Sequence, residues 1–198
     1  MKALFDRTRV FAYADTEDAV TDGADGIAVT VSYTEGGYLT ARGTDLDSLA
    51  ADCRTRGLEL LLLLQDAPKE QDVQDLHMTL VRRDMTARTL LASRHHRALD
   101  AIKQKMSQVR IVPICAPDMV RPWIYASYMG ACAYLTEPAE LLSDADSWGS
   151  PEIDRAHNAD VCIFAQNVDD EETVRALVRL GCDAVITHAP AMARALVW

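Results

Sequence analysis

Six polar residues fall where buried strands are expected to end, and they are the residues of this chain best placed to contact a ligand. In chain order they are Asp15, Arg42, Gln65, Arg94, His95 and Asn167. Arginine side chains bind anionic groups through paired hydrogen bonds, so convergence of Arg42 and Arg94 would create a site for a small anionic ligand. Arginines at loop ends are more often solvated, and the sequence leaves both interpretations open.

Metal binding and nucleophilic chemistry have weaker support. Mg²⁺ and Ca²⁺ need several oxygen ligands, and no carboxylates stand at the spacing of a metal site, although Asp15 and Asp66 could meet in space. His95 and His96 are adjacent at an expected helix start and do not share a face, which favours structural or solvated roles. Cys115 ends an apolar run with no base beside it in the sequence, which argues against a thiol nucleophile. We therefore predict no metal and no other cofactor.

Composition is that of an ordinary globular domain and excludes several partners. The 198 residues are 49% hydrophobic and 25% charged, enough for one substantial core. A net charge of −10 disfavours nucleic acid and anionic membrane surfaces. No apolar run approaches the roughly 18 residues of a membrane span. Five widely spaced cysteines are typical of free thiols in a reducing compartment. We predict one domain over residues 1–198, located in the cytoplasm.

Short apolar runs alternate with helical patterns along the whole chain. The strands and helices that they predict must position the six polar side chains named above. Eight runs read as buried strands: 10–13, 26–31, 38–40, 58–64, 89–92, 110–115, 161–165 and 184–187. Residues 131–135 read as a ninth, short strand inside a connection. Helical patterns cover residues 44–56, 73–83, 94–105, 170–180 and 189–197. This alternation predicts a parallel sheet closed into an eight-fold β/α barrel, with an open doubly wound sheet as the alternative.

The C-terminal segment carries a family resemblance. Residues 156–190, AHNADVCIFAQNVDDEETVRALVRLGCDAVITHAP, resemble the closing pattern of the glycerophosphodiester phosphodiesterase family, and TLLASRHHRAL and GADGIAVTV resemble earlier stretches of it. The matching residues are Ala156, His157, Phe164, Asn167, Gly181, Asp183, Ile186, Thr187 and Pro190. The resemblance implies a β/α barrel that hydrolyses glycerophosphodiesters with a divalent metal, Mg²⁺ or Ca²⁺.

The same resemblance shows where this chain departs from the family. The family has His-Arg-Gly after its first strand, Glu-x-Asp on its second, a His after its third and Glu-x-Lys on its fourth. At these positions the chain has Tyr13-Ala14-Asp15, then Ala28 and Thr30, then Ala41 or Arg42, then Leu63 and Gln65. Loss at four strand ends predicts a pseudoenzyme that binds a small ligand or a protein partner. The alternative is an active phosphodiester hydrolase, of lipid metabolism, with rearranged residues.

Three further expectations can be tested on the structure. Alternation along residues 60–65 places Leu63 inside the barrel and Gln65 at its rim. The chain is short between residues 32 and 44 for the family, so we expect irregular structure there. An exposed apolar patch containing Trp123 or Trp198 would favour self-association or a protein partner.

Overall fold

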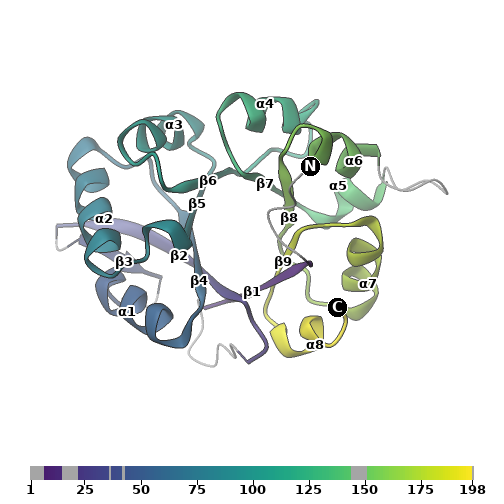
Figure 1. Cartoon of the computed structure of the whole chain (residues 1–198), viewed down its shortest axis with the longest axis horizontal. Coiled ribbons are helices and arrows are strands. Elements are labelled where there is room, and N and C mark those ends of the chain that lie inside the picture. The colour runs from purple at the N-terminus through teal and green to yellow at the C-terminus, as the bar shows by residue number, and fades with distance from the viewer. Residues whose placement is uncertain (1–6, 15–21, 36, 42, 144–150, 198) are drawn as a thin grey trace.

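The computed structural model describes residues 7–14, 22–35, 37–41, 43–143 and 151–197. In that part of the chain eight parallel strands form a ring enclosed by helices (Figure 1). The ring strands are β1 Arg9–Tyr13, β2 Gly26–Thr34, β4 Glu59–Leu64, β5 Thr89–Ser93, β6 Arg110–Pro113, β7 Ala133–Thr136, β8 Cys162–Ala165 and β9 Ala184–Thr187. Their order is β6-β5-β4-β2-β1-β9-β8-β7. The ends of this series meet through a parallel bridge between Ile114 and Leu135. The predicted β/α barrel is thereby confirmed.

Helices follow the strands around the outside of the ring. They are α1 Leu46–Arg56, α2 Glu70–Arg82, α3 His96–Lys105, α4 Pro122–Tyr128, α5 Pro138–Ser143, α6 Pro151–Asn158, α7 Glu171–Leu180 and α8 Pro190–Arg194, with a 3-10 turn at Thr86–Arg88. Asp45 caps α1 by accepting from the Ser48 amide at 2.9 Å, and Gly57 ends it with φ 73°. None of the described helices is long and apolar enough to cross a lipid bilayer.

Strands are present at both 38–40 and 131–135, but their places in the fold are the reverse of those predicted. Residues 38–40 lie in β3 (Gly37–Thr40), which pairs antiparallel with β2 outside the ring. Thr34 and Gly37 are paired in that hairpin, and a parallel connection needs a dozen or more residues. Residues 131–135 contribute instead to β7, a full member of the ring. The hairpin is the irregularity expected between residues 32 and 44.

The core has two zones, one inside the ring and one between the ring and the helices. Alternation along β4 divides its leucines, with Leu61 and Leu63 in the inner zone and Leu60, Leu62 and Leu64 in the outer one. The inward orientation expected for Leu63 is confirmed. Phe11 fills the ring so closely that a Cβ on Gly26 would lie 2.6 Å from its ring.

Buried carboxylates organise the end of the barrel where the strands begin. The Asp25 side chain is 7% exposed and forms ion pairs with Arg7 at 2.7 Å and Arg9 at 3.3 Å. Asp183 accepts from the Ile163 amide and from His157 Nε2, both at 2.8 Å. His157 is half-buried and its ring is fixed by this contact. These contacts connect neighbouring strands and stabilise the ring.

Candidate functional site

The opposite end of the barrel, where the strands end, is the mouth, the end at which barrel enzymes carry their chemistry. Its inner surface divides into two halves. What we call the apolar half comprises the ends of β2, β4, β5 and β6, with Ala28, Leu63, Ala92 and Ile114 facing inward. What we call the polar half comprises the ends of β7, β8, β9 and β1. Its polar side chains are Tyr13, Glu137, Gln166, Asn167, Asp169 and His188.

A hydrogen-bonded chain connects the ends of three strands in the polar half. Glu137 follows β7 and accepts from the side-chain amide of Gln166 and, at 3.3 Å, from that of Asn167. The Asn167 carbonyl oxygen then accepts from the Tyr13 hydroxyl at 3.2 Å. Asn167 holds a left-handed backbone with φ 59°, a conformation that asparagine tolerates better than most residues. This backbone turns the chain sharply after β8 and directs the Asn167 amide toward its two partners.

A second group lies beside this chain. Asp169 accepts from His188 Nδ1 at 2.8 Å, from the His188 amide at 2.7 Å and from the Thr187 hydroxyl at 3.0 Å. Burial raises the pKa of Asp169, but these hydrogen bonds lower it more, so the net pKa lies below the ordinary value. The His188 ring stacks on Tyr13 with centroids 4.5 Å apart. Because Nδ1 donates to Asp169, a neutral His188 keeps Nε2 as an acceptor, which suits it to receive a proton.

The apolar half is poorly suited to a divalent metal. The positions that the family resemblance assigns to its carboxylates hold Ala28, Thr30 and Leu63, and the first and last of these pack inside the barrel with other apolar side chains. Among the described residues no group of three or more His, Cys, Asp or Glu side chains could hold a metal ion. Mg²⁺ and Ca²⁺ need several oxygen ligands, usually including carboxylates. The donor set therefore does not fit the metal that the resemblance implies.

The structure places four of the six candidate ligand-contacting residues at the mouth. Gln65 and Arg94 are exposed just beyond β4 and β5, and His95 is exposed at the start of α3. Asn167 joins the polar half, whereas Asp15 and Arg42 lie outside the described residues. In ring order β5 is opposite β9, so Arg94 and His188 belong to facing sides of the mouth. Of the four candidates that the structure describes, Asn167 alone joins the hydrogen-bonded chain.

Structural roles account for the other conspicuous side chains. His96 Nε2 contacts the Ile114 carbonyl oxygen at 2.9 Å, and Nδ1 contacts the Tyr125 hydroxyl at 3.1 Å, so the ring joins α3 to β6 and α4. Burial raises the pKa of the Cys115 thiol to about 12, which keeps it protonated and unreactive. Trp123 is half-buried beneath Arg155, whose guanidinium carbon lies 5.8 Å from the ring centroid. Trp198 lies outside the described residues.

Three members of the polar half were missed in the sequence: Glu137, Gln166 and Asp169. Strand alternation could have found two of them, because Glu137 and Gln166 stand two residues after the inward-facing Leu135 and Phe164. The signal for Glu137 was lost when residues 131–135 were assigned to a connection. Asp169 lies in a loop, and its pairing with His188 is a tertiary contact without a local signature.

Comparisons with known proteins agree with this architecture. Residues 63–192, more than half of the chain, match the model of the glycerophosphoryl diester phosphodiesterase family. No curated protein sequence matches the chain significantly.

Solved structures show the same fold at low sequence identity. A glycerophosphodiester phosphodiesterase from Parabacteroides distasonis superposes with a TM-score of 0.77 at 13% identity, over 95% of both chains. One from Agrobacterium tumefaciens gives 0.74 at 14% identity, over 95% of this chain and 99% of that one. An Oleispira antarctica phosphodiesterase, solved with its product sn-glycerol-3-phosphate, gives 0.71 at 12% identity over 96% of both chains. The family match across strands β5 to β9 shows that the chain belongs to the glycerophosphoryl diester phosphodiesterase family, and the closed ring agrees with it.

Proposed function

We propose that this barrel is catalytically degenerate toward glycerophosphodiesters and binds a small anionic ligand at its mouth. The observation that carries the proposal is the apolar half. Leu63 and Ala28 pack where the family resemblance calls for charged side chains, and Thr30 is neutral. Hydrolysis of a phosphodiester develops negative charge in the transition state, and cationic groups must offset that charge. These side chains provide no cation.

The polar half and Arg94 support the binding role. Arg94 is exposed at the end of β5 and carries the guanidinium that an anionic group would contact. The side chains of the polar half offer both donors and acceptors to hydroxyl groups on the facing side of the mouth. A small molecule with one anionic end and one hydroxylated end matches this distribution. The Oleispira relative, solved with sn-glycerol-3-phosphate, supplies a suitable probe.

Calorimetric titration with sn-glycerol 3-phosphate tests the binding role, and release of that compound from glycerophosphocholine tests catalysis. We expect saturable binding, no release with Mg²⁺ or Ca²⁺ present, and affinity about tenfold weaker in Arg94→Gln. Arg97→Gln is the matched control, because Arg97 is an exposed arginine of the neighbouring helix α3. Binding that is absent, or equal in the two variants, would contradict the assignment of Arg94.

An active hydrolase remains the second candidate, favoured by the pair of Asp169 and His188. Their 2.8 Å contact leaves His188 Nε2 available as a base at the mouth. Metal-dependent release of sn-glycerol 3-phosphate by the wild-type protein, abolished in His188→Gln, would establish this candidate and refute catalytic degeneracy.

A protein partner or self-association is the third candidate. The exposed apolar side chains of Ile124 and Tyr128, on α4, and of Val120 just before it, favour this role. Light scattering during size-exclusion chromatography would reveal a dimer, and Tyr128→Ser would dissociate it. We place the protein in the cytoplasm because its five cysteines form no disulfide with one another and are mostly buried.

A further inference from the structure

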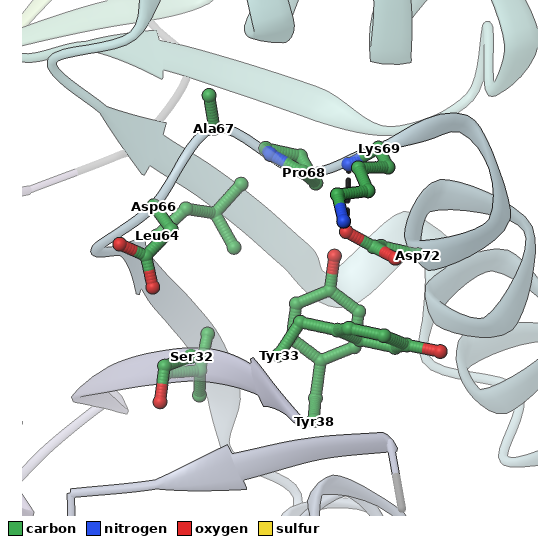
Figure 2. Close-up of a pocket in the computed structure, with 10 residues that line it drawn as sticks. Ser32, Tyr33, Tyr38, Leu64, Asp66, Ala67, Pro68, Lys69 and Asp72 are labelled. Carbon is green, nitrogen blue, oxygen red and sulfur yellow. Dashed lines mark hydrogen bonds between the residues drawn. The ribbon is translucent and has the colours of Figure 1, made fainter. Parts of the chain in front are cut away.

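A separate pocket of about 270 Å³ lies outside the ring, between the β2–β3 hairpin and the start of α2 (Figure 2). Val31 and Leu64, which form its inner wall, belong to the outer zone of the core and not to the barrel interior. The pocket is therefore distinct from the mouth, and its occupancy does not depend on the function proposed above. Its volume is below the roughly 300–1,000 Å³ of sites for drug-sized ligands, so its occupant must be small.

The Tyr38 side chain is the feature that points to a ligand. Tyr38 is 6% exposed, and its buried hydroxyl has no hydrogen-bond partner within the described part of the chain. Its ring is fixed edge-to-face against Tyr33, with centroids 5.2 Å apart. Figure 2 shows the Tyr38 hydroxyl pointing into the pocket toward Pro68 and Asp72, while the Tyr33 hydroxyl points away. A buried hydroxyl without a partner costs folding free energy, which a bound hydrogen-bonding group would recover.

The charges around the pocket select the class of ligand. Asp66, Asp72 and Lys69 line it, two carboxylates against one ammonium group and the positive end of α2. Asp72 is buried and already accepts from the Lys69 amide at 2.6 Å, so the first turn of α2 carries its own anion. A ligand anion would be repelled by the Asp72 carboxylate there, and a ligand cation would be repelled by the Lys69 ammonium group. A neutral molecule avoids both penalties.

The hydrogen-bonding groups narrow the class further. Burial and then the nearby Asp72 raise the pKa of Tyr38, so its hydroxyl stays protonated and can donate or accept. A ligand hydroxyl can take either complementary role, whereas a carbonyl or an ammonium group can take one. Apolar surface from Val31, Leu64 and Pro68 would contact the carbon skeleton. We propose that this pocket binds a small neutral polyol, with one ligand hydroxyl bonded to Tyr38.

NMR titration of the full chain tests the proposal directly. The probes are glycerol and myo-inositol as neutral polyols, inorganic phosphate as the anion and ethanolamine as the cation. We expect saturable shifts of the backbone amides of Val31, Tyr38 and Lys69 with at least one polyol, and with neither ion. Saturable shifts with phosphate or ethanolamine in place of the polyols would overturn the proposal, and so would the absence of saturable shifts with all four probes.

Two matched variants locate the binding group. Tyr38→Phe removes the hydroxyl that points into the pocket, so we expect polyol affinity to fall about tenfold, the loss of one hydrogen bond. Tyr33→Phe removes a hydroxyl that donates to Asp75 at 2.8 Å outside the pocket, so affinity should stay within about twofold. Equal polyol affinity in Tyr38→Phe and the wild type would refute the role of Tyr38. The wild-type titration decides the proposal even if a variant folds poorly.

Discussion

The two halves of the mouth differ in chemistry although the same ring of parallel strands builds both. The ends of β2, β4, β5 and β6 are closed by side chains such as Ala28 and Leu63. The ends of β7, β8, β9 and β1 carry a connected set of hydrogen-bonding groups around Asn167. The outer zone of the core packs against strands all around the ring, so one framework supports both an apolar and a polar side of the mouth.

Two of the residues that carry the family resemblance at the C-terminus, His157 and Asp183, lie at the other end of the barrel. His157 and Asp183 are bonded to each other where the strands begin, and Asp183 also accepts from the buried Ile163 amide. Residues at that end of a barrel generally serve stability. The part of the resemblance that these two residues carry therefore concerns the framework of the barrel and not its mouth.

Asp183→Ala should therefore give the largest loss of stability among single changes considered for the two ends of the barrel. It removes a buried acceptor and leaves the Ile163 amide and the His157 ring without this partner, for a loss of about 3 kcal/mol. Chemical denaturation measures the change. His157→Ala, which removes one of the two partners of Asp183, should cost about 1 kcal/mol. An Asp183→Ala loss below that of His157→Ala would contradict the structural role.

Leu63→Glu tests whether the apolar half tolerates a restored carboxylate. The new charge would enter an apolar surface with no cation to offset it, and we expect a loss of about 2 kcal/mol because Leu63 is only partly buried. Gln65→Glu places the same charge on the exposed rim two residues later and should change stability by about 0.5 kcal/mol or less. Thermal melts of both variants and the wild type measure these changes in stability. Equal melting temperatures for Leu63→Glu and the wild type would show that the apolar half is open to water.

The sequence predicted those parts of the fold that depend on contacts between residues close together in the chain. The alternation of leucines in β4 and the helix over residues 44–56 could be predicted because each depends on neighbours along the chain. The hairpin at β3 was misread because four residues carry too little periodicity to show strand direction. The hydrogen bonds of the polar half could not be predicted, because partners such as Tyr13 and Asn167 are 154 positions apart in the sequence. Only the closure of the ring brings such residues together.

Tyr13→Phe would sharpen the description of the polar half with a smaller effect. The variant keeps the ring that stacks on His188 and loses the hydrogen bond to Asn167, for an expected loss of about 1 kcal/mol. In NMR spectra the side-chain amide resonances of Asn167 should shift, because the variant lacks the hydroxyl that donates to the Asn167 carbonyl oxygen. Unchanged stability together with an unchanged Asn167 signal would show that the hydrogen-bonded chain is not formed in solution.

The contribution of Asp169 to the pH dependence of folding stability should be the smallest of these effects. Its pKa is lowered in the fold by hydrogen bonds from His188 and Thr187, despite the opposing effect of burial. The folded state therefore holds its proton less tightly than the unfolded state, whose pKa is about 3.9. The resulting stabilisation is complete above that value and is lost as pH falls through the lower folded pKa. Asp169→Asn removes this dependence, so the stability difference between wild type and variant should shrink as the pH falls below about 4. The side chain is about half exposed, so solvent screening keeps the change small. A difference that grows as the pH falls below about 4 would show that Asp169 is bonded in its protonated form, which would remove the basis for treating His188 as an oriented base.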